Sequence, residues 1–133
     1  MSDDLTHLPS ALRRFLELYG AARYWDSHEA LEDEWRRTGS DFYQALILYA
    51  SAWVHWKRGN AHGVRAQLKK AIERLADYPI GYLGLDVAAL REHCRAVRQE
   101  VARNSDNWPD RVAALPLSLS PDRLRGDEVE LEV

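Results

Sequence analysis

The residues best suited to chemistry lie within one short segment, His28-Glu29-Ala30-Leu31-Glu32. His28 and Glu32 are four residues apart, so on a helix their side chains project from the same face and reach one point. Imidazole together with carboxylate suits zinc, iron, manganese or nickel, and we therefore consider His28, Glu29 and Glu32 candidate ligands of a divalent transition metal. Zinc-protease helices carry a second histidine where Glu32 stands, which argues against a protease.

Three further polar residues occur in a segment that is otherwise apolar. Gln44, Ser51 and His55 are separated by seven and four residues, so on a helix they form one stripe. Burying an unpaired polar group costs about 1–3 kcal/mol, so the stripe needs partners. We expect it to face His28 and Glu32 across a helix interface, where His55 could supply an additional ligand if the cluster binds a metal.

Three interpretations of this polar cluster stay open. Its members can satisfy one another in a structural network that fixes how the helices align, which is the commonest arrangement in helical bundles. They can instead bind a metal, with Glu29 as ligand or general base of a small metal-dependent hydrolase. The third interpretation is acid–base chemistry without metal.

The elements that must position these residues are all helices. Apolar spacing of three and four residues, with glycine and capping signals at the ends, predicts an all-α fold: a compact bundle of about five helices with antiparallel hairpins. Asp41, Asn60 and Asp86 are the expected N-caps of the last three helices, and Gly39 and Gly59 the expected stops. The predicted helices cover about 9–19, 24–37, 41–58, 61–76 and 87–103.

Length and charge restrict the class of protein. The chain has 133 residues, from which we expect a single helical domain over 1–115 and an acidic tail over 116–133, either mobile or pairing as a strand with a partner. The formal net charge of -3, with no basic stripe, argues against a nucleic-acid partner.

The longest nearly uncharged run, 42–56, is too short for a membrane span, and the N-terminus lacks signal-peptide features. We therefore expect a cytoplasmic protein.

The remaining reactive and aromatic side chains have plainer interpretations. The single cysteine, Cys94, lies on an apolar helix face and is expected to be a buried, inert thiol. His62 and His93 are predicted to be surface residues. Tryptophans could form an aromatic ligand cage, but core packing is the commoner use of such residues. They are Trp25, Trp35, Trp53, Trp56 and Trp108.

Several blocks of the sequence resemble a known family. Four of these blocks are similar to the signature of the DUF309 family of small bacterial and archaeal proteins. They are the run from Tyr24 to Trp35, Gln44-Ala45-Leu46-Ile47, His55 with Arg58-Gly59-Asn60, and Tyr82-Leu83-Gly84-Leu85-Asp86. The resemblance extends over about residues 12–101. It implies a compact helical fold and assigns no activity.

Two function classes follow from these observations. The first is a non-enzymatic interaction module, in which a helical groove with exposed Tyr and Trp holds a peptide or protein partner and the acidic tail is a second contact. An exposed aromatic face would also permit a homodimer. The second is a metal-binding protein or small metal-dependent hydrolase that uses His28, Glu32 and His55. We favour the first.

Overall fold

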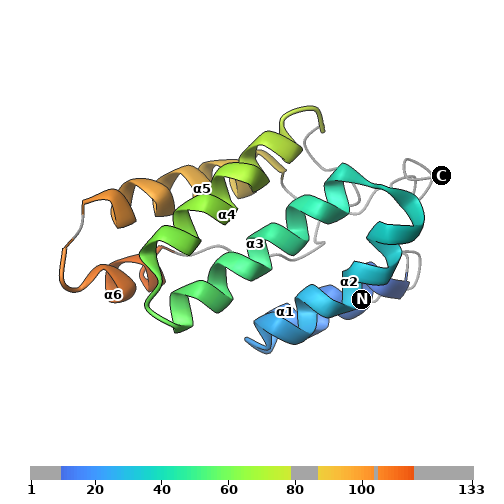
Figure 1. Ribbon diagram of the computed structural model, residues 1–133, viewed down its shortest axis with the longest axis horizontal. Coiled ribbons are helices and arrows are strands. Elements are labelled where there is room, and N and C mark those ends of the chain that lie inside the picture. Colours follow the sequence, from blue (N-terminus) through green and yellow to red (C-terminus); the bar gives the residue numbers. More distant parts are fainter. Residues whose placement is uncertain (1–9, 79–86, 104, 116–133) are drawn as a thin grey trace.

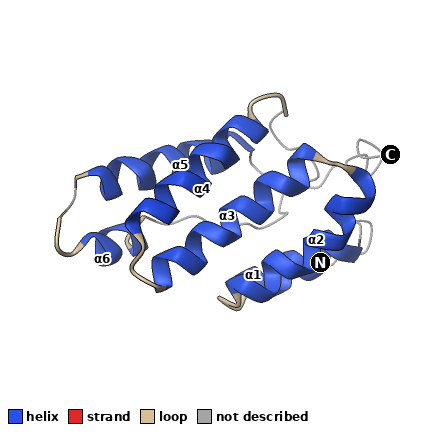
Figure 2. Cartoon of the chain, in the orientation of Figure 1, coloured by secondary structure: helices blue, strands red, loops and turns tan. Residues whose placement is uncertain are grey.

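A computed structural model describes residues 10–78, 87–103 and 105–115, and these residues form six helices (Figures 1 and 2). No strand occurs in this part of the chain, which confirms the predicted all-α bundle. None of the helices described is both long and apolar enough to cross a membrane. The helices are α1 (Ser10–Gly20), α2 (Tyr24–Thr38), α3 (Asp41–Lys57), α4 (Ala61–Leu75), α5 (Val87–Ala102) and α6 (Trp108–Ala113).

Helix α3 occupies the centre of the bundle. It contacts α2 on one side and α4 on the other, while α1 packs on α2 and α5 packs on α4 (Figure 1). A helix enclosed in this way must be apolar nearly all round, which explains the uncharged run in its sequence. Its buried residues are Phe42, Tyr43, Ala45, Leu46, Ile47, Tyr49, Ala50, Ala52 and Trp53.

The helix ends follow local chemistry. Asn60 caps α4 through its side-chain oxygen, which accepts from the Gly63 N–H at 3.0 Å, as predicted. Gly39 and Gly59 adopt left-handed φ values of 69° and 68°, as expected after helix ends. The predicted cap of α3 is wrong by one residue. Ser40 has the extended backbone that a cap needs and accepts from the Tyr43 N–H at 3.1 Å, whereas Asp41 is already helical.

Helix α6 is the element that the sequence pattern missed. It is only six residues long, too short to show an apolar period, and it starts at Trp108-Pro109 with proline in its first turn. The Trp56 indole N–H donates to the Pro109 carbonyl at 2.9 Å, which attaches α6 to the end of α3. The predicted cap Asp86, the preceding loop from residue 79 and the tail over 116–133 lie outside the described residues.

A chain of hydrogen bonds crosses the core between α1, α3 and α5. The hydroxyls of Tyr19 and Tyr49 are 3.2 Å apart, Tyr49 Oη lies 2.9 Å from His93 Nδ1, and His93 Nε2 lies 2.9 Å from the Leu115 carbonyl. Because a carbonyl only accepts, Nε2 carries the proton, so Nδ1 accepts from Tyr49 and Tyr49 accepts from Tyr19.

The prediction that His93 lies on the surface is therefore wrong. His93 is only 8 % exposed, and burial lowers the pKa of its imidazole from the ordinary value. Its neighbour Cys94 is fully buried, as predicted, and burial raises the pKa of the thiol to about 12. An imidazole can be buried here because both ring nitrogens have hydrogen-bond partners.

Candidate functional site

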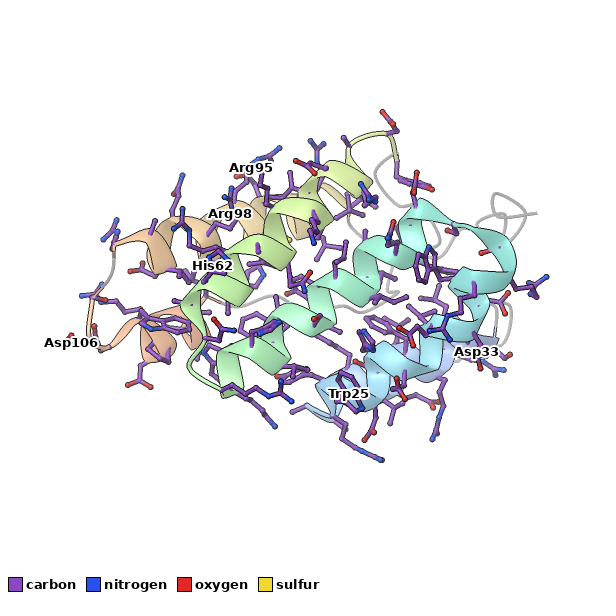
Figure 3. The ribbon with its side chains drawn as sticks, in the orientation of Figure 1. Trp25, Asp33, His62, Arg95, Arg98 and Asp106 are labelled. Carbon is purple, nitrogen blue, oxygen red and sulfur yellow. The ribbon has the colours of Figure 1, made fainter. Side chains whose placement is uncertain are left out.

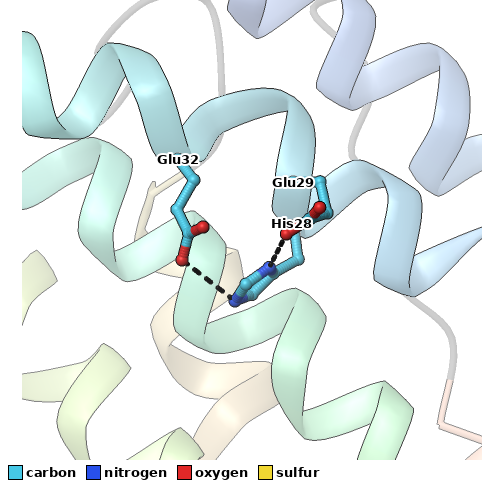
Figure 4. A group of neighbouring side chains, drawn as sticks. All are labelled: His28, Glu29 and Glu32. Atoms are coloured by element: carbon cyan, nitrogen blue, oxygen red, sulfur yellow. Dashed lines mark ion pairs between the residues drawn. The ribbon is translucent and has the colours of Figure 1, made fainter.

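The structure groups His28, Glu29 and Glu32 on one face of α2 (Figure 4). His28 Nδ1 lies 3.9 Å from Glu29 Oε2, and His28 Nε2 lies 3.9 Å from Glu32 Oε2. One ligand atom from each residue can be chosen so that all three lie within 4.8 Å of one another. The His28 side chain is 14 % exposed, against 25 % for Glu32 and 53 % for Glu29, so the group lies where the helix surface meets solvent.

The way α2 packs explains this position. Ser27 and Leu31 are its buried residues, so they face the rest of the bundle. His28 lies at the edge of this buried face. The Ser27 hydroxyl donates to the Tyr24 carbonyl at 2.7 Å, which satisfies a buried polar group without a tertiary partner. Trp25 stacks on the His28 ring, with centroids 4.9 Å apart and planes 12° apart. The indole thereby covers one face of the imidazole and limits its rotation.

The cluster has unused capacity for a ligand. His28 Nδ1 is shielded from solvent and has no hydrogen-bond partner within the described structure, since 3.9 Å is beyond hydrogen-bond range. One Glu32 oxygen, Oε1, is engaged by Arg36 at 3.3 Å, which leaves Oε2 facing His28. Zinc bonds to nitrogen and oxygen of about 2.0–2.2 Å limit two ligands of one ion to about 4.4 Å apart. The 4.8 Å span of the cluster exceeds that limit, so the side chains would have to rotate toward one another to hold one ion.

The polar stripe of α3 does not join this cluster. Gln44 Oε1 accepts from Arg74 Nε at 2.6 Å, and His55 Nδ1 lies 3.1 Å from Asn60 Nδ2. A Cβ built on Gly63 would come within 2.5 Å of His55 Nδ1, so His55 is packed against the first turn of α4. At these positions the stripe faces α4, because the short Gly59-Asn60 connection folds α4 back onto it.

The other stripe residue, Ser51, is half-buried on α3. His28, Glu29 and Glu32 are thus brought together, whereas Gln44 and His55 have their partners in α4 and its N-cap. His55 is correspondingly absent from the candidate ligand set that the described residues form.

Only one of the five tryptophans is prominently exposed. Trp25 is 54 % exposed, and among the described residues it is the one large hydrophobic side chain that is exposed. Trp53, in contrast, is buried. The other three, Trp35, Trp56 and Trp108, are partly buried against the core. These positions favour core packing over an aromatic cage. Trp35, one of the tryptophans considered for such a cage, is packed against the core instead.

A pocket of about 300 Å³ adjoins Trp25, between the start of α2 and the end of α3. Its apolar wall includes Tyr24, Trp25 and Val54, and its rim carries Lys57 and Arg58. Lys57 Nζ lies 5.4 Å from the centroid of the Tyr24 ring, a cation–π contact. The pocket therefore combines an apolar wall with positive charge. The remaining lining residues are Ala22, Arg23 and Asp26, and Arg23 pairs with Asp26 at 2.8 Å.

The fold and these sites define a small all-helical protein that carries an exposed aromatic pocket and a His/Glu cluster on one helix. Residues 12–67 match the family model described as Domain of unknown function (DUF309), which confirms the family resemblance for this part of the chain. The match covers most of α1, all of α2 and α3, and the first half of α4. It therefore includes the His28 cluster, the polar stripe of α3 and the pocket beside Trp25. No curated protein and no solved structure matches the chain.

Proposed function

We propose that this protein is a non-enzymatic binding module whose contact surface is Trp25 and the pocket beside it. The observation that carries the proposal is the exposure of Trp25, at 54 %, in a structure whose other described tryptophans are buried or packed on the core. Tryptophan is among the residues that most often dominate binding energy at protein interfaces. Here it borders a concave surface, which supplies the shape that a bound side chain needs.

The charge of the rim indicates the chemistry of the partner. Lys57 and Arg58 are exposed, and Arg23 is already paired with Asp26, so the free positive charge lies on the α3 side of the pocket. An apolar side chain would pack against Trp25 and Val54, while acidic residues beside it would face Lys57 and Arg58. The module is therefore proposed to bind a peptide segment that combines acidic and apolar residues.

This proposal predicts the behaviour of two variants in peptide binding. Fluorescein-labelled peptides of alternating Glu and Leu would be titrated with the protein and followed by fluorescence anisotropy. Trp25→Ala is expected to weaken binding about tenfold or more, because the aromatic anchor that the bound peptide would cover is lost. Lys57→Glu/Arg58→Glu is expected to weaken it and to reduce its salt dependence.

The matched controls are Asp33→Ala, on the exposed face of α2, and Lys69→Glu/Lys70→Glu, which makes the same charge change on α4. Both should bind as the unaltered chain does. Peptides in which lysine replaces glutamate should not bind. Equal affinity for Trp25→Ala and the unaltered protein would contradict the proposal.

A second candidate function, transition-metal binding, is supported by a separate observation. The ligand atoms of His28, Glu29 and Glu32 lie within 4.8 Å of one another, and His28 Nδ1 lacks a hydrogen-bond partner in the described structure. Nitrogen and carboxylate donors suit zinc and its neighbours in the first transition row. Three protein ligands would leave further coordination positions for water, which is the arrangement of catalytic rather than structural zinc sites.

Metal binding is tested on untagged protein by titration with zinc, followed by elemental analysis after gel filtration. The candidate predicts near-stoichiometric zinc in the unaltered chain and its loss in His28→Ala and in Glu32→Gln. His62→Ala, which removes an exposed histidine outside the cluster, should retain the metal. If the unaltered protein emerges without zinc, the cluster is a local polar arrangement and the metal function is excluded.

A further inference from the structure

A second groove lies on the opposite side of the bundle, between α4 and α5. It has a volume of about 370 Å³, and three arginines line it: Arg65 from α4 and Arg95 and Arg98 from α5. The apolar part of the lining is Ile72 and Ala102. Figure 3 shows Arg95 and Arg98 at the edge of the molecule remote from Trp25, so this groove is separate from the pocket described above. Its lining contains no acidic residue.

The positive charge of this groove is only partly compensated within the described structure. Arg95 pairs with Glu92 at 3.1 Å, and Glu92 is itself exposed. Arg98 Nε donates to the Arg65 carbonyl at 3.2 Å, which holds its guanidinium on the groove wall without neutralising it. Among the described residues neither Arg65 nor Arg98 forms an ion pair. A guanidinium has five N–H donors in a planar fork, so these side chains can still bind carboxylates.

The chain itself contains a segment of complementary composition. Residues 127–133 read Asp-Glu-Val-Glu-Leu-Glu-Val, with four acidic and three apolar side chains. In an extended backbone, successive side chains point to opposite faces, so Glu128, Glu130 and Glu132 would share one face and the valines and leucine the other. The first face matches the arginines, and the second matches Ile72 and Ala102.

The distance along the chain allows this contact. Leu115, the last described residue, lies beside α5, because its carbonyl accepts from His93. Eleven residues, 116–126, separate Leu115 from the acidic segment and can span up to about 36 Å when extended. The 16 residues of α5 rise over only about 24 Å, so every part of the groove is within reach.

We propose that residues 127–133 bind in the α4–α5 groove of their own chain, with their carboxylates on Arg65, Arg95 and Arg98. The contact would cover a concentrated positive surface with a tethered segment, whose effective concentration is high because it is linked to the site. Any anionic partner of this groove would then have to displace the tail. The proposal rests on the groove and the tail composition, and is independent of the function proposed for Trp25.

The test uses the full chain with a paramagnetic label at Gly126→Cys, which leaves the acidic segment unchanged. Because Cys94 is fully buried, the label reacts at the introduced cysteine. In low salt, the backbone amide resonances of Arg95, Arg98 and Arg65 are expected to lose intensity relative to the diamagnetic control. About 1 M NaCl, which shortens the screening length to about 3 Å, should restore them.

Three variants decide between this contact and others. Arg95→Glu/Arg98→Glu and Glu128→Gln/Glu130→Gln/Glu132→Gln should each abolish the effect, whereas Lys69→Glu/Lys70→Glu, exposed on α4 but outside the groove, should retain it. The proposal is overturned if no groove resonance is affected, or if the affected resonances surround Trp25. It is also overturned if broadening appears only between labelled and unlabelled copies in a mixed sample, since the contact would then be intermolecular.

Discussion

Leu31→Ala is expected to lower the free energy of unfolding by about 2–5 kcal/mol, a large part of the 5–15 kcal/mol typical of a small domain. Leu31 is fully buried, and it is the buried apolar side chain with which α2 enters the core. Truncating it removes apolar contacts and leaves a cavity that the surrounding helices fill only in part. Because α2 carries Trp25 and the His28 cluster, the same change should loosen both sites.

Urea unfolding followed by far-ultraviolet circular dichroism measures this loss. Leu31→Met is the matched control, because it nearly conserves volume and should cost less than about 1.5 kcal/mol. A loss for Leu31→Ala no larger than the about 0.5 kcal/mol of ordinary surface changes would show that α2 is held by other contacts.

Stability is expected to fall as the pH drops below about 6.5, the ordinary pKa of histidine, and His93 is expected to cause part of this fall. Burial lowers the pKa of His93 in the folded protein, so between the folded and unfolded pKa values the unfolded chain binds one more proton. Unfolding is therefore favoured at acid pH, with a slope of up to about 1.4 kcal/mol per pH unit from this one group. From about pH 7.5, one unit above the ordinary histidine pKa, both states are neutral at this residue, and its contribution is constant.

The structural reason is the direction of the hydrogen bonds around His93. Nδ1 accepts from the Tyr49 hydroxyl, so protonating it would place two donors face to face in the core. His93→Gln should reduce the acid slope, although it also lowers stability at neutral pH, and His62→Gln should leave the slope unchanged. Urea titrations at pH 5, 6 and 7 provide the comparison. A wild-type slope that persists in His93→Gln would assign the effect to other groups.

The amino-acid sequence determined the local features of this protein. Five of the six helices in the described chain follow from apolar spacing, and their ends follow from residues such as Asn60, Gly39 and Gly59, whose effect is confined to adjacent turns. The clustering of His28, Glu29 and Glu32 was predictable for the same reason, since all three belong to one helix.

Only the tertiary structure decided which partners the buried polar groups have. Gln44 meets Arg74 thirty residues away, and Tyr49 meets His93 forty-four residues away, so no local pattern identifies either pair. Helical periodicity predicts that α3 carries a polar stripe. Whether that stripe faces α2 or α4 depends on how the helices pack against one another. The burial of His93 depends on its hydrogen bond to the Leu115 carbonyl. The positive charge of the α4–α5 groove depends on arginines that come from two helices. These features arise when distant segments meet, because hydrogen bonds and charges act through space whereas helical periodicity acts along the chain.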